Sequence, residues 1–415
     1  MTKLFLRDRL VAAKEEPRLG IHSFHRFFGK LIPAIPAAAV ELFSEPGELV
    51  LDPFCGSGTT LVESIVRGRD AVGIDINPLS VLISKVKTTL VDPEDVILET
   101  KDALRQGRII LGNGLPPPPY CVNIHHWYRP SVIRELTALH TAVNGKPVGA
   151  ARNFMAACLS AINRNVSNAD PQHVFPGYSK RLRRLDMERG RRIDVFETFA
   201  TGVRKRIAYL EELHERMNGT GRATVHRAQA DSPPAINREV ALVVTNPPYI
   251  SSVRYLETLK LEMSWAGLIG NAGAYRELDR LQIGTERFGA AEKCEYLESG
   301  IAEVDDLSRR LFKAGHRGMS RTVSLYFSRM EAALGTWDKA MRTGGRMVFK
   351  LSPSRVRGEV VSTPEIVTRM LERLGYSLDE EFLDEYNPNS RSLLTSRNYY
   401  SGRIDSDTIL VLRKR

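Results

Sequence analysis

The sequence predicts an α/β protein with a mostly parallel sheet and a helical insertion, and three observations carry this prediction. Continuous apolar runs at residues 49–51 and 241–245 are typical of strands that are buried on both faces of a parallel sheet. Helical patterns alternate with such strands at both ends of the chain, whereas between residues 91 and 223 amphipathic helical patterns predominate. We therefore expect one α/β domain in two parts, residues 1–90 and 224–415, with residues 91–223 inserted between them.

The chain is basic, with 59 Lys and Arg residues against 49 Asp and Glu residues, a net charge of +10 and a pI near 9.4. This balance suggests a polyanionic partner, although a merely soluble basic protein fits it equally well. The four cysteines are far apart and form no C-x-x-C pair, so neither a zinc ribbon nor a disulfide framework is implied, and a reducing cytoplasm is the expected compartment. No run approaches the ~18 apolar residues of a membrane helix, and the N-terminus is too charged for a signal peptide.

Residues 22–48 lead into the first strand. Pro36 can open a helix there, because the first turn of a helix does not use the N–H that proline lacks, and Pro46-Gly47 closes the segment in a turn. His22 and His25 suggest a metal site, but nothing nearby in the sequence completes a ligand set. We expect them to be ordinary polar histidines.

A glycine turn follows the first strand, in the stretch DPFCGSGTT at residues 52–60. Gly56 and Gly58 allow the backbone to approach a ligand closely, and a helix follows that ends at Gly68. The next strand ends at Asp75, seventeen positions beyond Gly58. Strand, glycine turn, helix, strand and acid in this order are typical of a site that holds an adenosine ribose by its hydroxyls.

Two features separate this turn from other nucleotide sites. Leu61 stands where the third glycine of G-x-G-x-x-G would be, which argues against a nucleotide-dependent oxidoreductase, and no Lys follows as in a phosphate-binding P-loop. DPFCGSGTT followed by GIDINP resembles the S-adenosylmethionine-dependent DNA amino-methyltransferases, the family that methylates adenine N6 or cytosine N4. The resemblance covers residues 22–90 and 225–415.

The resemblance implies a Rossmann-like class I methyltransferase fold, with a mostly parallel seven-stranded sheet and one antiparallel strand near the C-terminus. It also implies S-adenosyl-L-methionine as the cofactor. Asp75 would take the ribose hydroxyls, and Asp231 would meet the adenine amine, although an acid beside Ser and Pro could also simply cap a turn. Lys30 and Pro33 would close over the methionine end, and Phe54 and the two glycines would line the loop. The implied cofactor-binding residues are Lys30, Pro33, Asp52, Phe54, Gly56, Gly58, Asp75 and Asp231.

In the insertion, four consecutive prolines in residues 115–120 predict an extended connector, and amphipathic helices are predicted from residue 130 to 144 and from 203 to 217. His125, His126, Trp127 and Tyr128 form an aromatic cluster that either packs the insertion onto the core or stacks on a base. Residues 179–192 form a basic run that either neutralises phosphates or is a solvated helix face. The candidate DNA-binding residues are Lys180, Arg181, Arg183, Arg184, Arg191 and Arg192.

A second motif follows the strand at residues 241–245, in the turn Asn246-Pro247-Pro248-Tyr249. Two prolines cannot continue a central strand, so the turn is rigid. The lone pair of an exocyclic amine is delocalised into its base, which makes the nitrogen a poor nucleophile. The side-chain oxygen of Asn246 and a carbonyl of the proline turn can accept both amine hydrogens, which favours a tetrahedral nitrogen. Tyr249 would stack on the target base after it leaves the duplex.

The target base is the finer question. In the resembling family, Asn at the first turn position usually accompanies adenine N6 methylation, so Asn246 favours adenine. Cytosine N4 is the alternative, because the segment that follows resembles a branch with both kinds. An RNA amino-methyltransferase and an inactive DNA-binding specificity protein are further alternatives. The implied partner is double-stranded DNA, a companion restriction endonuclease is a candidate partner, and no membrane partner is expected.

The C-terminal part completes the sheet. Residues 315–321 are expected in a mobile loop that closes on DNA or in an ordinary surface loop. A helix, the strand at residues 346–352 and a second helix at about 364–374 follow. The chain ends with two strands joined by a loop, in which Arg391, Arg397, Tyr399 and Tyr400 are candidate DNA contacts.

Overall fold

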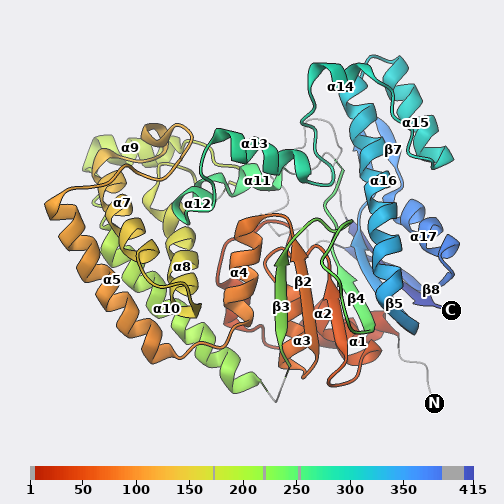
Figure 1. Ribbon diagram of the computed structural model, residues 1–415, viewed down its shortest axis with the longest axis horizontal. Coiled ribbons are helices and arrows are strands. Elements are labelled where there is room, and N and C mark those ends of the chain that lie inside the picture. Colours follow the sequence, from red (N-terminus) through yellow and green to blue (C-terminus); the bar gives the residue numbers. More distant parts are fainter. Residues whose placement is uncertain (1–4, 172, 218–220, 251–253, 386–405) are drawn as a thin grey trace.

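The fold is taken from a computed structural model that describes residues 5–171, 173–217, 221–250, 254–385 and 406–415. The described residues form a sheet of seven strands in the order β3-β2-β1-β4-β5-β9-β8 (Figure 1). β9 runs antiparallel to its two neighbours, β5 and β8, and all the other pairings in this sheet are parallel, which confirms the predicted sheet. The strands are β1 (Leu49–Asp52), β2 (Asp70–Asp75), β3 (Ala223–Arg227), β4 (Val240–Thr245), β5 (Met341–Leu351), β8 (Tyr376–Glu385) and β9 (Ser406–Lys414).

The central strands are buried on both faces because helices cover both. Val50 packs in one hydrophobic core with α1 (Leu6–Glu15) and α2 (Ala34–Phe43). Leu49 and Leu51 pack on the other face with α16 (Arg317–Ala340) and α17 (Thr363–Arg373). The first face also carries α3 (Thr59–Val66) and α4 (Pro78–Thr88), and a short hairpin of β6 (Ser354–Val356) and β7 (Glu359–Val361) follows β5. The continuous apolar pattern of these strands therefore has the predicted cause.

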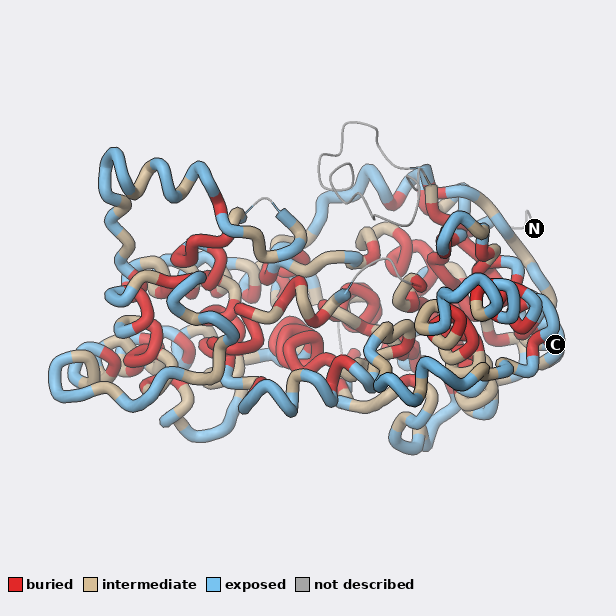
Figure 2. Tube along the Cα trace, turned by 90° about the horizontal axis from the view of Figure 1, so that it is seen from above, coloured by how far each residue is buried: buried red, intermediate tan, exposed pale blue. Residues whose placement is uncertain are grey.

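The insertion is helical, as predicted, and lies beside α4 at the β3 side of the sheet (Figure 1). It has its own hydrophobic core, and buried segments run through both halves of the molecule (Figure 2). This core also includes Leu256, Trp265 and Leu278, which come after the second motif and were assigned to the α/β domain by the prediction. The helices are α5 (Pro93–Asn113), α6 (Ile124–Trp127), α7 (Pro130–Asn144), α8 (Ala150–Val166), α9 (Lys180–Arg189) and α10 (Val195–Arg216), followed after β4 by α11 (Tyr255–Thr258), α12 (Lys260–Trp265) and α13 (Ala272–Leu281).

The aromatic cluster of the insertion divides into two parts. Trp127 and Tyr128 are buried, and the Tyr128 hydroxyl donates to Asn163 Oδ1 at 2.8 Å, so these two rings pack the insertion, in line with the first of the two interpretations. His125 and His126 are exposed.

The predicted loop at residues 315–321 is wrong for most of its length, because α16 begins at Arg317. The seryl oxygen Ser320 Oγ lies 2.8 Å from Ser308 Oγ of α15 (Ala302–Lys313), and both side chains are buried. This contact holds the first turn of α16 against α15. The sequence did not indicate a helix here, because two glycines lie within residues 315–321. α14 (Ala290–Cys294) lies nearby (Figure 1).

Arg391, Arg397, Tyr399 and Tyr400 lie outside the described residues. None of the helices that could be searched in the described ranges is long and apolar enough to cross a membrane.

Candidate active site

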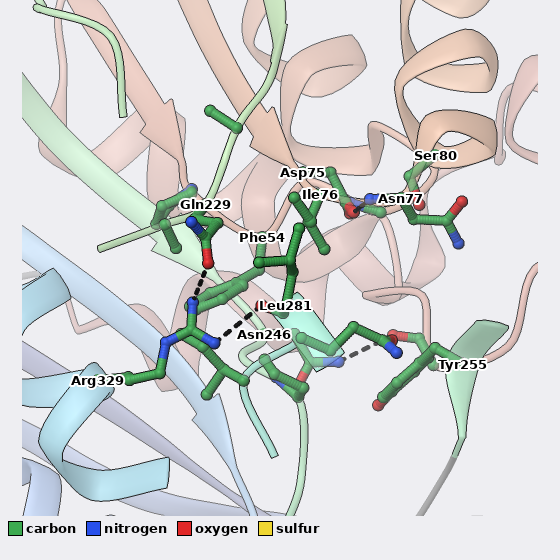
Figure 3. A pocket seen from close by; sticks show the side chains of 18 of the residues that line it. Phe54, Asp75, Ile76, Asn77, Ser80, Gln229, Asn246, Tyr255, Leu281 and Arg329 are labelled. Carbon is green, nitrogen blue, oxygen red and sulfur yellow. Dashed lines mark hydrogen bonds between the residues drawn. The ribbon is translucent and has the colours of Figure 1, made fainter. Parts of the chain in front are cut away.

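The two sequence motifs meet at one edge of the sheet. β1, β2 and β4 are parallel neighbours, so the turns that follow them lie together at their carboxyl ends. A pocket opens there between the glycine turn, the Asn246 turn and the segment that begins at Phe27 (Figure 3). The predicted residues that line it are Phe54, Gly56, Asp75, Asn246 and Pro248. Two further apolar residues, Ile76 and Ala228, line it beside Gln229.

The glycine turn has a backbone that other residues adopt only with strain. Gly56 has a φ of 51° and Gly58 a φ of 74°, in the left-handed region. A Cβ on Gly58 would also lie 2.8 Å from Ser84 Oγ and 3.1 Å from the Ser84 backbone. Gly58 precedes α3 and lies outside the pocket lining, so it shapes the turn, whereas Gly56 faces the pocket.

Asp75 ends β2 and accepts two backbone hydrogen bonds. Its Oδ2 accepts from the Gly56 N–H at 2.9 Å, and its Oδ1 accepts from the Asn77 N–H at 2.7 Å. Burial raises the pKa of Asp75 to about 6. The carboxylate thus fixes the glycine turn and still has lone pairs available for hydroxyl donors in the pocket.

Asp52 joins the two motifs instead of lining the pocket. Its Oδ1 accepts from Thr245 Oγ1 at 2.8 Å and from the Phe54 N–H at 3.2 Å. It is almost fully buried, and this burial raises its pKa to about 6. The carboxylate therefore connects the end of β1 to the end of β4, directly before Asn246.

Asn246 has one satisfied and one unsatisfied polar atom. Its Nδ2 donates to the Gly29 carbonyl at 2.8 Å. Its Oδ1 is buried and has no hydrogen-bond partner among the described residues. Because a carbonyl can only accept, the amide nitrogen must face Gly29, and the oxygen is left as an unused acceptor. Such an orphan acceptor is costly in a folded protein unless a ligand satisfies it.

Tyr249 does not line the pocket. Its hydroxyl donates to Asp407 Oδ1 at 3.0 Å. The aromatic rings in the lining are those of Phe27, Phe54 and Tyr255, and the half-buried Tyr255 bonds to the backbone of Tyr249. Stacking of Tyr249 on a base therefore stays a prediction.

Asp231 also lies outside the lining, and it pairs with an arginine that lines the pocket. Arg329 Nε donates to Asp231 Oδ2 at 2.6 Å, and Arg329 Nη2 donates to Gln229 Oε1 at 2.7 Å. Arg329 and Gln229 line the pocket, and Figure 3 shows the contact of Arg329 with Gln229 and with the Leu281 segment. Asp231 therefore orients Arg329, and its contact with an adenine amine stays a prediction.

The segment before β1 contributes residues other than the predicted ones. Lys30 Nζ donates to the His22 carbonyl at 2.9 Å, and burial lowers its pKa. Pro33 is the residue that precedes α2. Neither lines the pocket, whereas their neighbours Phe27 and Gly29 do.

The two histidines of this segment make structural contacts. His22 Nε2 lies 2.6 Å from Glu63 Oε1, and His25 Nε2 lies 3.0 Å from Ser160 Oγ. Both rings are buried, and burial lowers the pKa of each.

Lys87 is a contact that the sequence did not indicate. Its Nζ is buried and donates to the Ser57 carbonyl at 2.7 Å, so this hydrogen bond stabilises the glycine turn. Burial lowers its pKa to about 7. Phe27, Gly29, Tyr255 and Arg329 were likewise not predicted, since none of them stands in a motif with known spacing.

Most of the basic run lies on α9, and Arg191 and Arg192 follow this helix. α9 is at the end of the insertion that faces the same way as the carboxyl ends of the strands (Figure 1). Lys180, Arg181, Arg183, Arg184 and Arg192 are exposed. Arg191 is different, because its Nε pairs with Asp186 Oδ1 at 2.5 Å and its Nη2 donates to Asn168 Oδ1 at 2.8 Å. Arg191 therefore has a structural role in the insertion.

Comparisons of the sequence with known proteins agree with the motifs. Residues 21–85, which include the glycine turn and Asp75, match a family model described as DNA methylase, N6_N4_Mtase. The chain is 23% identical to the Type II methyltransferase M.MvaI of Kocuria varians, over 94% of this chain and 90% of that protein. It is 22% identical to the Type II methyltransferase M.BsoBI of Geobacillus stearothermophilus, over 90% of this chain and 82% of that protein. TrmN from Thermus thermophilus aligns in structure at a TM-score of 0.34 and 14% identity, over 97% of this chain and 54% of that one.

Proposed function

We propose, on the premise that the chain belongs to the N6/N4 DNA methyltransferase family, that it moves a methyl group from S-adenosyl-L-methionine to the exocyclic amine of a base in DNA. One observation carries this proposal. The buried Oδ1 of Asn246 is an unused acceptor at a pocket that also contains the glycine turn and Asp75. An amine donates hydrogen bonds, so it is the kind of group that this oxygen would satisfy.

The residues of the pocket fit the proposed cofactor. Asp75 can accept from two ribose hydroxyls, and the apolar side chains of Phe54, Ile76 and Ala228 can hold the adenine ring. Gly56 lets the backbone approach closely because no Cβ stands there. When bound, the cofactor supplies an electrophilic methyl group on a positively charged sulfur. The chain's own residues then have to orient the amine.

Asn246 and the proline turn would do this. Asn246 Oδ1 can accept one amine hydrogen, and a carbonyl of the rigid proline turn can accept the other. The nitrogen then becomes more tetrahedral, and its lone pair points away from both acceptors. No strong base is needed, because the proton can leave to water after the new bond forms.

The base that we propose is adenine, since Asn246 occupies the position that favours adenine N6 in this family. Cytosine N4 is the second candidate, because the segment after the turn resembles a branch with both kinds. Both amines are attached to an aromatic ring carbon next to a ring nitrogen, so the same two acceptors serve either.

The proposed substrate is double-stranded DNA. A base inside a duplex cannot reach a turn at the sheet edge, so the target would have to leave the stack. The exposed cations of α9 can neutralise phosphates of bound DNA. We propose that the insertion and the segment after Tyr249 read the target sequence, because they share one hydrophobic core.

Radiolabelled methyl transfer tests this function. Purified protein and labelled S-adenosylmethionine are incubated with unmethylated phage DNA or with total RNA. Label in DNA is expected. Label in RNA alone, or in neither, would contradict the proposal, and DNA binding without transfer would indicate a specificity protein.

A further inference from the structure

Tyr249 ends the turn that begins with Asn246, and its side-chain hydroxyl is bound by Asp407. We propose that Asp407, at the start of β9, is a positioning residue for methyl transfer. It fixes the Tyr249 side chain at the end of the turn that carries Asn246. This inference rests on the proposed function. Here the Asp407 cluster means Asp407, Tyr249, Ser352, Lys350 and Asp384.

The Asp407 carboxylate is buried, with 1% of the residue exposed, and both of its oxygens are engaged. Oδ1 accepts hydrogen bonds from the Tyr249 hydroxyl, at 3.0 Å, and from the Ser352 hydroxyl. Oδ2 pairs with Lys350 Nζ at 2.7 Å. A buried carboxylate is tolerated only with such partners, so the geometry of the cluster is strongly determined.

The strands make the cluster rigid. Asp384 on β8 and Asp407 on β9 stand opposite each other in the antiparallel register, and two buried carboxylates so placed would repel. Lys350 on β5 lies within ion-pair distance of both, with 3.6 Å to Asp384 Oδ2. Lys14 of α1 pairs with Asp384 Oδ1 at 2.8 Å. The anchor for Tyr249 is thus built into three neighbouring strands and a helix.

Tyr249 is held at two points. Its hydroxyl is bound by Asp407, and its backbone is bound by the half-buried Tyr255, which lines the pocket. Because Asn246 and Tyr249 belong to the same short turn, a fixed Tyr249 also limits the movement of Asn246. In enzymes that accelerate a reaction by orienting the reacting groups, a small displacement of a positioning residue strongly lowers the reaction rate. The hydroxyl bond also gives a reason for Tyr, and not Phe, at this position.

A double-mutant cycle tests this role. Tyr249→Phe removes the hydroxyl and keeps the ring, and Asp407→Ala removes the acceptor. We expect either change to lower kcat for methyl transfer to unmethylated phage DNA about tenfold, and to leave the KM for S-adenosylmethionine within about twofold. The double variant should be no slower than Asp407→Ala, because both changes break the same contact.

A matched control exists in the same sheet. The Tyr376 hydroxyl donates to Asp338 Oδ1 at 3.1 Å, and Lys414 Nζ pairs with Asp338 at 2.9 Å. Tyr376 begins β8 at the edge opposite the pocket, so Tyr376→Phe should keep the wild-type kcat.

Two outcomes would overturn the inference: wild-type kcat in Tyr249→Phe, or independent losses that multiply in the double variant. If Asp407→Ala does not fold, Tyr249→Phe alone still decides. Failure of the proposed function is distinct, because the wild-type protein itself would then transfer no methyl group to DNA.

Discussion

The side-chain nitrogen of Asn246 donates a 2.8 Å hydrogen bond to the backbone carbonyl of Gly29. The contact joins the turn after β4 to the segment before β1, which are far apart in the sequence. It also decides which way the amide faces, because a carbonyl cannot donate. The Oδ1 atom is consequently buried without a partner among the described residues. In the proposed function this oxygen accepts a hydrogen bond from the amine of the target base.

Gly58→Ala should lower the free energy of unfolding by more than the ~1–2 kcal/mol that a left-handed backbone costs an alanine. The added Cβ would also collide with Ser84 Oγ at 2.8 Å. Gly47→Ala is the matched control, since Gly47 has a φ of 83° and no atom lies within 4 Å of the position that an added Cβ would take. Urea denaturation of both variants measures the difference, and equal losses would argue against a tight glycine turn.

Asp52 predicts a pH dependence of stability. Burial raises its pKa to about 6 in the native protein, against about 4 in an unfolded chain. The native state therefore holds this proton more tightly, and the free energy of unfolding falls as the pH rises from about 4 to about 6. In Asp52→Asn this contribution is absent. Between about pH 4.5 and about pH 7.5, the free energy of unfolding of the wild type should fall by on the order of 2 kcal/mol relative to that of the variant. A difference in unfolding free energy that does not change with pH would contradict the raised pKa of Asp52.

The cations of α9 should bind DNA through phosphates. The triple variant Lys180→Ala, Arg181→Ala, Arg183→Ala is expected to weaken DNA binding and to reduce the salt dependence of log Kd by about 2 to 3. Fluorescence anisotropy of labelled duplex DNA across a salt series measures both. Lys339→Ala, Arg369→Ala, Arg373→Ala removes the same charge elsewhere and should have a much smaller effect. If the two triple variants weaken DNA binding equally, the affinity depends on the net charge of the protein and not on the position of the α9 cations.

The insertion is joined to the segment after the Asn246 turn by a buried ion pair, Arg164 Nε to Glu262 Oε1 at 2.9 Å. Arg164→Met would leave Glu262 buried without its charge partner, so we expect a loss of about 3–5 kcal/mol in the free energy of unfolding. Arg164→Met with Glu262→Leu should recover part of it. Chemical denaturation measures the free energy of unfolding of both variants. If the double variant recovers none of the loss, the stabilisation comes from the hydrogen bonds that Arg164 donates to backbone carbonyls, and not from its ion pair with Glu262.

The parts of the site that could be predicted are those encoded locally. A strand, two glycines, a helix and Asp75 follow one another closely, and the proline turn follows directly after β4, so their chemistry is readable from spacing. The sheet follows from apolar runs that need cover on both faces.

The remaining parts depend on contacts between distant segments. Arg329 reaches the pocket from α16 because Asp231 and Gln229 hold it, and Tyr255 reaches it from the segment after the turn. Lys87 is polar at a buried position of α4, where no pattern suggests a bond to Ser57. The start of α16 was missed because glycine and polar residues favour a loop, whereas the buried contact of Ser308 with Ser320 stabilises a helix.

Nucleoside analysis of methylated DNA by mass spectrometry tests the central claim most directly. Unmethylated DNA is incubated with S-adenosylmethionine and either the wild-type protein or Asn246→Ala, and cofactor binding is measured in parallel. We predict N6-methyladenine with the wild type, and at least a ~100-fold slower reaction with a variant that still binds the cofactor. N4-methylcytosine would correct the base and leave the role of Asn246 intact. Methylation by Asn246→Ala at the wild-type rate would contradict the account.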